Sequence, residues 1–244
     1  MSARAPSLFV CHGGGPLPVL GDKSHSSLIE FFTTKAQQIF TPKPKAIVMV
    51  TAHWEESQPF ISSGAKHDLL YDYYGFPSES YKIQYKASGS PQVAQQVADL
   101  LRKAGFSPEM DSKRGWDHGT FIPLKMMLPE ADIPIVQVSV LSSQDAAAHY
   151  KMGRALESLR DEGVAIVGSG MIPHNFSYIR KFMAGGSSKP WGVAFDAALT
   201  EACAIEDVEE REAKLLQWKT MPGREECQAL GAAEHLMPLF VVAG

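Results

Sequence analysis

Four apolar runs rich in β-branched residues set the strongest constraint on how this chain can fold. None of them alternates cleanly between apolar and polar residues, as a strand with one face in water does. We therefore expect four buried strands in a sheet that is covered on both faces. The runs are SLFV (7–10), KAIVMVTA (45–52), IPIVQVSV (133–140) and GVAIVGS (163–169).

Helical patterns separate these runs. The clearest spans 90–105, where Ser90 is a suitable N-cap and Pro91 suits the first helical position. The segment 145–163 carries similar signals. Strands that alternate with helices predict an α/β fold, with a central, largely parallel or mixed sheet and helices on both faces. Further helices are expected at about 25–39, 191–203 and 207–218.

Two segments have the composition of loops. AGGSSKP (184–190) is rich in glycine and serine, and residues 66–82 are polar and aromatic. The second segment is long enough to form a lid or a binding loop over a site. With 244 residues, the chain has the size of one α/β domain, so we expect a single domain over 1–244.

Composition and charge argue against several classes of function. A net charge of -4 gives no basic surface for nucleic acid, and no apolar stretch is long enough to span a bilayer. The N-terminus contains only a short apolar stretch, which does not support a signal peptide. Cys11, Cys203 and Cys227 are odd in number and form no C-x-x-C motif, which suits a reducing compartment. We expect a cytoplasmic protein that binds neither nucleic acid nor membrane.

Histidines follow three of the four predicted strands. His12 follows the first run, His53 follows the second, and His174 comes shortly after the fourth. Because ligands of open α/β sheets bind outside the carboxyl ends of the strands, these side chains can converge. Neutral imidazole is the commonest side-chain metal ligand, and two or three of them suit Fe(II) or Zn(II). The sequence therefore predicts a metal site at this edge of the sheet.

The other histidines divide into two groups. His118 lies in a glycine-flanked segment, GWDHGTF, and His235 lies in GAAEHLMPLF near the end of the chain. Both are candidates for the same site. His25, His67 and His149 are expected to be ordinary surface or hydrogen-bonded structural residues.

Three neighbours of these histidines need separate interpretation. Asp117 either orients the imidazole of His118 or caps the turn in which it lies. Glu234 is either a carboxylate ligand or a solvated helical residue. Cys11 is expected in the core, because in strand geometry it points away from His12. No G-x-S-x-G elbow, dinucleotide fingerprint or P-loop is present, so serine hydrolase and nucleotide-binding functions have no motif behind them.

Six short motifs occur along nearly the whole chain: CHGGGP (11–16), TAHWE (51–55), YYGFP (73–77), WDHGTFIPL (116–124), GSGMIPHNF (168–176) and EHLMPLF (234–240). In these motifs and their order the chain resembles the class III extradiol ring-cleaving dioxygenases, and most closely the 4,5-DOPA dioxygenase-like branch. The resemblance implies a mononuclear non-haem Fe(II) enzyme that opens a catechol ring next to its two hydroxyls with O₂. Zinc is the second metal that this branch can carry.

The resemblance also implies roles for individual residues. His12 and His53 match the first two metal ligands, and His235 matches the third. His174 matches the acid/base residue and could complete a four-coordinate shell around zinc. His118 matches the second histidine of the pocket, beside the bound diol and oxygen.

The remaining expectations concern substrate and assembly. His118, Asp117 and Tyr74 are the expected substrate contacts, and Tyr71, Tyr73 and Phe76 could complete an aromatic wall. The expected partners are a small aromatic diol and O₂, with the chain either a monomer or a homodimer. Relatives usually continue beyond FVVAG, so we expect the chain to lack a C-terminal extension.

Two other functions use the same residues. A zinc hydrolase would use the histidine cluster to activate a water molecule, with Glu234 as its carboxylate base. A non-catalytic binding protein would keep the pocket and bind an aromatic diol without consuming it.

Overall fold

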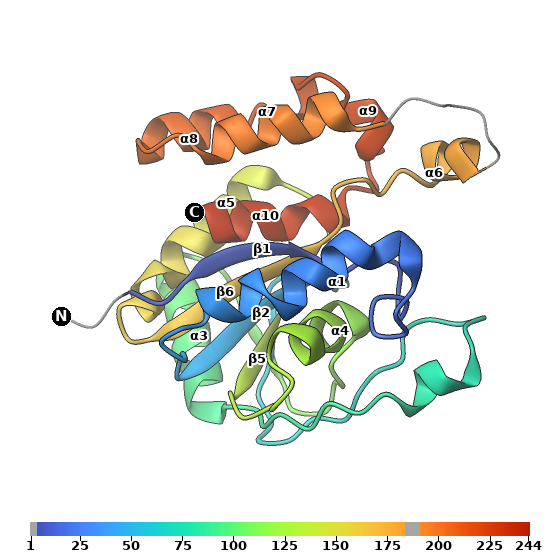
Figure 1. Cartoon of the computed structure of the whole chain (residues 1–244). Coiled ribbons are helices and arrows are strands. Elements are labelled where there is room, and N and C mark those ends of the chain that lie inside the picture. Colours follow the sequence, from blue (N-terminus) through green and yellow to red (C-terminus); the bar gives the residue numbers. More distant parts are fainter. Residues whose placement is uncertain (1–3, 184–190) are drawn as a thin grey trace.

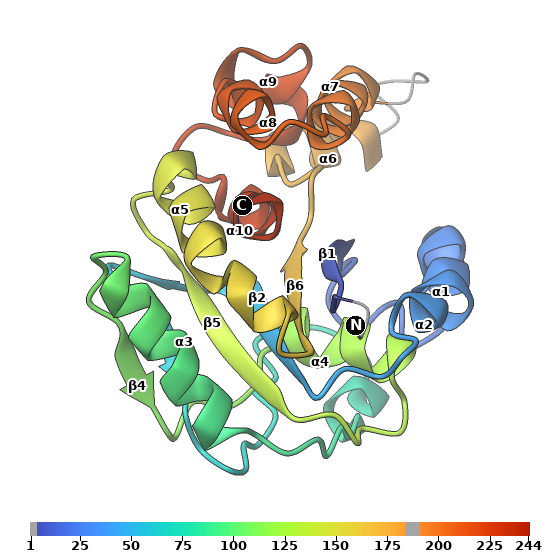
Figure 2. The ribbon, with the colours of Figure 1, turned by 90° about the vertical axis from the view of Figure 1, so that its left-hand side faces the viewer.

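The computed structural model describes residues 4–183 and 191–244, and a six-stranded mixed sheet forms its centre (Figures 1 and 2). The strand order is β1-β6-β2-β5-β3-β4. The first four strands in this order are parallel, β3 is antiparallel to β5, and β4 is parallel to β3. The strands are β1 (Ser7–Cys11), β2 (Ala46–Glu56), β3 (Phe60–Ser62), β4 (Glu109–Asp111), β5 (Ile135–Leu141) and β6 (Val164–Gly170).

Helices cover both faces of the sheet (Figure 2). Within β2, Ile47 and Met49 pack into the core on one face, and Val48 and Val50 pack into the core on the other. A strand buried on both faces has no polar side to alternate with, which explains its continuous apolar run. The first face carries α1 (Ser26–Thr33), α2 (Lys35–Ile39) and α4 (His118–Met127), and the second carries α3 (Pro91–Lys103), α5 (Ala146–Leu156) and α10 (Met237–Ala243).

A further layer of helices lies over α5 and α10 (Figure 1). Phe195, Leu199 and Trp218 from this layer belong to the same core as α5 and α10. The chain enters the layer after β6 and returns to the sheet at α10. The helices between are α6 (Phe176–Met183), α7 (Val193–Cys203), α8 (Val208–Leu215) and α9 (Arg224–Cys227).

The predicted α/β class and all four predicted strands are confirmed. The predicted helix at 25–39 is divided at Thr34, between α1 and α2, and the helix at 145–163 ends at Leu156. The helices expected at 90–105, 191–203 and 207–218 are present as α3, α7 and α8, with α3 capped by Ser90. The predicted loop at 184–190 lies outside the described residues.

Several elements were not predicted. The strands β3 and β4 have three residues each, too few to show a period of two. The helix α4 contains Gly119 and Pro123, which read as loop signals, yet it is almost wholly buried. The helices α6, α9 and α10 were also missed. In the described part of the chain, no helix is long and apolar enough to cross a membrane.

Candidate metal centre and active site

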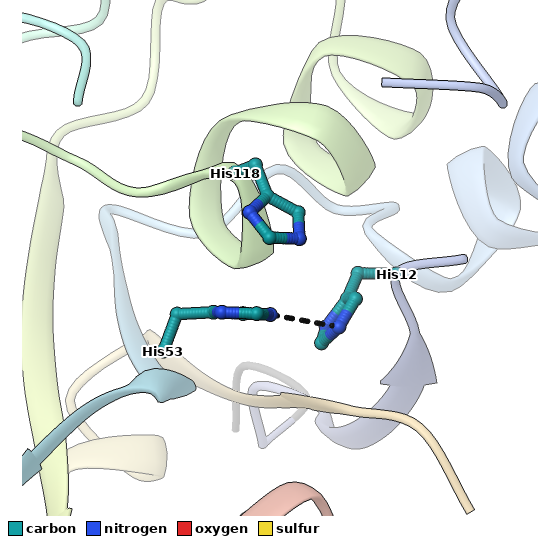
Figure 3. A group of neighbouring side chains, drawn as sticks. All are labelled: His12, His53 and His118. Carbon is teal, nitrogen blue, oxygen red and sulfur yellow. Dashed lines mark hydrogen bonds between the residues drawn. The ribbon is translucent and has the colours of Figure 1, made fainter. Parts of the chain in front are cut away.

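Four histidines meet at the carboxyl ends of the central strands. His12 comes directly after β1, His53 lies near the end of β2, and His118 is the first residue of α4. His235 lies in a short 3₁₀ turn (Glu234–Leu236) just before α10. The Nε2 atom of His53 is 3.1 Å from Nε2 of His12 and 3.2 Å from Nε2 of His235. The ring of His118 stands beside that of His53, with centroids 3.9 Å apart (Figure 3).

The position of His53 depends on an irregularity in β2. The pairing of β2 with β6 ends at Thr51, and its register with β5 shifts between Thr51 and Glu55. His53 donates its backbone N–H to Thr51 Oγ1 at 3.2 Å, and Arg114 donates to the His53 carbonyl at 3.0 Å. The regular ladder is therefore interrupted between Thr51 and Glu55, and side chains hold the backbone of His53 instead.

Close packing of backbones brings His235 to the sheet. The His235 carbonyl accepts a hydrogen bond from Met171 N–H at 3.1 Å. A Cβ atom at Gly170 would lie 2.0 Å from that carbonyl oxygen, and one at Gly168 would lie 2.6 Å from the Pro238 carbonyl oxygen. Only glycine at these two positions lets the turn and the start of α10 lie directly against β6.

The Nδ1 atom of each of the four imidazoles faces an oxygen. His12 Nδ1 is 3.0 Å from Ser169 Oγ, whose own proton is donated to the Gly119 carbonyl. Ser169 therefore accepts from His12, and this places the His12 proton on Nδ1. The same atom of His235 is 2.9 Å from Glu234 Oε1.

Asp72 faces the Nδ1 atoms of the other two imidazoles, those of His118 and His53. Its Oδ1 lies 2.8 Å from Nδ1 of His118, and its Oδ2 lies 3.4 Å from Nδ1 of His53. Because a carboxylate only accepts hydrogen bonds, the proton of each imidazole lies on Nδ1 and the lone pair lies on Nε2. All four lone pairs therefore belong to Nε2.

This arrangement fits a metal ion. Nε2 lone pairs held close together repel one another, and a cation between them reverses the sign of the interaction. Two nitrogen ligands at about 2.1 Å from one ion lie roughly 3.0 to 3.4 Å apart. The separations of His53 Nε2 from His12 Nε2, 3.1 Å, and from His235 Nε2, 3.2 Å, match that spacing.

The electrostatics keep these imidazoles neutral. Burial and then the neighbouring imidazoles lower the pKa of His53 to about 2 and that of His12 well below its usual value. Burial also lowers the pKa of His235 to about 4, although Glu234 opposes the shift. At pH 7 all three side chains can therefore act as metal ligands without first losing a proton.

The two carboxylates are ionised. Burial alone would raise the pKa of Asp72, but the hydrogen bond from His118 and its charge lower that pKa below the usual range. Hydrogen bonds from His174 and His235 likewise hold the pKa of Glu234 well below its ordinary value, despite burial. Each carboxylate therefore faces the Nδ1 atoms of two histidines. Carboxylates in this position fix the orientation of imidazoles at metal sites.

His174 lies on the outer side of this cluster. Its ring stacks on that of His235, with centroids 3.4 Å apart and planes 19° apart. Its Nδ1 lies 3.3 Å from Glu234 Oε1, and its backbone N–H bonds to the Cys227 carbonyl. Two groups of side chains have possible ligand atoms within 4.8 Å of one another: His12, His53 and His118 form the first (Figure 3), and His174, Glu234 and His235 form the second.

A cavity of about 370 Å³ opens onto the histidines. Of the aromatic residues expected in its wall, Tyr73, Tyr74 and Phe76 line it. Tyr74 is 90% exposed and lies at the mouth. Tyr71 is outside the lining and bonds to the Ile83 carbonyl instead. The segment 66–82 therefore contributes one wall of the cavity, and its expected role as a lid or a binding loop stays a prediction.

The structure corrects the expectation for Asp117. Its side chain is completely buried behind the cavity, caps α4 through Thr120 N–H, and accepts hydrogen bonds from Thr51 and Gln137. A carboxylate with no exposed surface cannot touch a substrate. Its contacts with Thr51 and Arg114 support the backbone of His53, so it is a positioning residue and not a substrate contact.

Sequence reasoning missed one supporting residue. Asp72 lies in the middle of a polar loop, and nothing in its local pattern indicates that the loop folds back onto α4. His25 is a hydrogen-bonded structural residue, as expected: its Nε2 accepts the Gly14 N–H at 3.0 Å and its Nδ1 bonds to Asp22. It therefore holds the glycine loop that follows His12.

Comparison with known proteins gives the class of the chain. The family described as the catalytic LigB subunit of aromatic ring-opening dioxygenase matches residues 8–244. The dioxygenase tasH of Hapsidospora irregularis is 43% identical, over 98% of this chain and 78% of that protein. The 4,5-DOPA dioxygenase extradiol of Beta vulgaris is 40% identical, over 98% of this chain and 85% of its own length.

A solved structure is also similar to this chain. The crystal structure of the uncharacterized protein JW3007 from Escherichia coli K12 has a TM-score of 0.68 and 33% identity, over 86% of this chain and 80% of that chain. The chain belongs to the LigB family of aromatic ring-opening dioxygenases. It is an extradiol ring-cleaving dioxygenase, a metal-dependent class of enzyme, as its motifs indicated.

Proposed function

We propose that this enzyme holds one metal ion through Nε2 of His12, His53 and His235, and that it opens a catechol next to its hydroxyls with O₂. The observation that carries the proposal is the convergence of these atoms at 3.1 and 3.2 Å, each on an imidazole whose Nδ1 faces an oxygen. The curated 4,5-DOPA dioxygenase relatives support the same reaction.

Fe(II) is the proposed metal, with Zn(II) the second ion that three neutral imidazoles accept. When bound, iron supplies the oxygen chemistry and the positive charge that attracts the two diol oxygens. Held only by His12, His53 and His235, the ion would keep coordination positions free for the diol and O₂. The contribution of the protein is to orient these partners within the cavity.

His118 is suited to take a proton from a diol hydroxyl. Its Nδ1–H donates to Asp72, which leaves the Nε2 lone pair as the base. The Asp72 carboxylate then stabilises the imidazolium that forms, as the carboxylate does in a His-Asp pair. His118 also lies beside His53, so the proposed base stands next to a proposed metal ligand.

His174 is proposed as the second acid/base group. Its Nδ1 faces Glu234, its ring stacks on that of His235, and the residue lines the cavity. This leaves Nε2 as the ring nitrogen that can exchange a proton with the substrate. The side chain could instead complete a four-coordinate shell around zinc, which would remove it from proton transfer.

The same geometry weakens the zinc hydrolase alternative. A hydrolase of this kind needs a carboxylate that faces a bound water. In the described part of the chain, the two carboxylates nearest the imidazoles, Asp72 and Glu234, face Nδ1 atoms on the rear side of the histidines. Neither is placed to accept a proton from water inside the cavity.

Oxygen uptake tests the proposal. Protein loaded anaerobically with Fe(II) is mixed with a panel of catechols and air, and we expect uptake of one O₂ per diol with a coloured ring-opened product. Zinc-loaded protein and the His174→Ala variant should show none. No uptake with any diol, in protein that binds one iron per chain, would contradict the proposed reaction.

Metal content tests the ligands separately. His12→Ala and His53→Ala should each reduce bound iron from one per chain to less than about a tenth, because two imidazoles remain. His67→Ala is the matched control: this histidine bonds to backbone carbonyls away from the site, and its replacement should leave metal content unchanged. Equal metal content in all three variants would refute the proposed ligand set.

The remaining proposals concern the location of the protein in the cell and its oligomeric state. We propose a cytoplasmic location, supported by the three free thiols Cys11, Cys203 and Cys227. Whether the chain is a monomer or a homodimer stays a prediction for sedimentation analysis.

A further inference from the structure

The cavity wall has an unusual chemical composition beyond its histidines. Five of the lining residues are the histidines already described, and all of the others are glycine, aromatic, methionine or isoleucine. No lysine, arginine, aspartate or glutamate of the described chain lines the cavity. The non-histidine lining is Gly13, Gly14, Gly15, Tyr73, Tyr74, Phe76, Met171, Phe176 and Ile179.

Two apolar walls stand on either side of the histidine centre. Phe176 and Ile179 lie three residues apart on α6, so they share one face of the helix. The Phe176 ring lies against His174, with centroids 4.8 Å apart. On the other side, the Tyr73 ring lies 5.7 Å from that of His118. A ring substituent of a diol bound at the centre would therefore lie between aromatic and aliphatic side chains.

Among the described residues, the two carboxylates that contact the histidines cannot pair with a charged substituent. Asp72 lies against His53 and His118, and Glu234 lies against His174 and His235. Both are negative, so they repel a carboxylate, and both are already held by two imidazoles, so neither is free for an ammonium group. Phe176 and Tyr74 are 57% and 90% exposed, so the outer part of the cavity is open to water. A charged group that is buried deeper in the cavity loses hydration and gains no charged partner in the described lining.

The size of the cavity allows a substituent. A volume of about 370 Å³ lies within the range of pockets that hold drug-sized ligands, roughly 300 to 1,000 Å³. A bare catechol ring is much smaller than such ligands. The cavity therefore has room for the ring and for a group of several carbon atoms beside it, where apolar burial is favourable.

We infer that the preferred substrate is a catechol with a neutral, apolar ring substituent, alkyl or aryl, in contact with Phe176 and Ile179. The inference rests on the proposed diol cleavage and narrows its substrate class. Phe176 and Ile179 are the proposed specificity residues.

A substrate comparison tests the inference. The iron-loaded enzyme is assayed by oxygen uptake with 4-tert-butylcatechol, L-3,4-dihydroxyphenylalanine and 3,4-dihydroxyphenylacetate, and the binding of each diol is measured by anaerobic calorimetry. We expect kcat/KM and affinity to be at least tenfold higher for 4-tert-butylcatechol than for either charged diol. Equal or higher values for the charged diols would overturn the inference and leave the proposed reaction intact. Absence of uptake with every diol would refute the proposed reaction itself.

A charge placed in the wall gives a second test. Ile179→Arg supplies a cation at the proposed substituent site, and it should lower the preference for 4-tert-butylcatechol over 3,4-dihydroxyphenylacetate at least tenfold. Ser177→Arg is the matched control, because this residue is exposed on α6 and outside the lining. Unchanged preference in Ile179→Arg, at wild-type metal content and circular dichroism, would show that the substituent lies elsewhere. If that variant fails to fold, the comparison on the wild-type enzyme still decides the question.

Discussion

At the scale of single residues, the site is built from imidazoles whose orientation is fixed by oxygen atoms next to Nδ1. Ser169, Asp72 and Glu234 each face an Nδ1 atom and so turn Nε2 toward the centre. Burial then keeps the imidazoles neutral, because an imidazolium in this place would be poorly hydrated and would repel its neighbours. The pattern explains why the carboxylates of the site need not bind metal themselves.

Asp72→Asn tests this orienting role. The amide is nearly the same size but removes the negative charge behind His118 and His53, so we expect metal affinity or kcat to fall about 10- to 100-fold. Steady-state oxygen uptake and metal titration measure the two effects. Asp68→Asn, in the same loop but exposed, should leave both unchanged. Equal behaviour of the two variants would contradict the role of Asp72.

At the scale of elements, the loop after β1 is held by a residue of the following segment. His25 accepts the Gly14 N–H at 3.0 Å and lies against Gly13, where an added Cβ would be only 2.9 Å from its ring. Because Gly13, Gly14 and Gly15 line the cavity directly after His12, this contact shapes one side of the site. Gly13 and Gly15 have positive φ, so the loop itself depends on glycine.

Variants at His25 test the contact. His25→Ala removes the acceptor of Gly14 N–H, and we expect KM for the diol to rise about three- to tenfold, since a hydrogen bond contributes about 1 kcal/mol. His25→Gln keeps an acceptor oxygen of similar reach and should recover most of the loss. The measurement is KM by oxygen uptake at saturating iron. A KM that is unaltered in His25→Ala would show that the loop needs no such support.

At the scale of the whole molecule, a buried histidine outside the site links stability to pH. His149 accepts Leu141 N–H at its Nε2, and burial lowers its pKa to about 4. The unfolded chain, with an ordinary histidine pKa of about 6.5, binds a proton between pH 6.5 and 4 that the folded chain does not. The free energy of unfolding should therefore fall as the pH decreases through this range, and the contribution lost is about 2 kcal/mol at pH 5.

Urea unfolding at pH 7 and pH 5 measures this effect. His149→Gln does not titrate, so its free energy of unfolding should fall by about 2 kcal/mol less than that of the wild type over the same interval. Circular dichroism at each pH follows the transition. Parallel falls in both proteins would assign the pH dependence to other groups, such as the histidines of the site.

The sequence by itself indicated four of the six strands, the helices α1, α2, α3, α5, α7 and α8, and the histidines that are proposed to carry the chemistry. Continuous apolar runs between helical patterns favour strands covered on both faces, and parallel strands bring the residues at their carboxyl ends to one edge. His12, His53 and His174 were therefore expected together from spacing alone. The positions of His118 and His235 came from the resemblance of their motifs to a family.

Only the tertiary structure decided how these residues are supported. Asp72 reaches His118 because a loop folds over α4, and Asp117 faces away from the cavity because its carboxylate caps that helix. His235 reaches the centre because glycines let α10 lie against β6. Such contacts join residues far apart in the chain, and no local sequence pattern, such as a hydrophobic period or a helix cap, indicates them. Local patterns encode which elements form, and the packing of those elements decides which side chains meet.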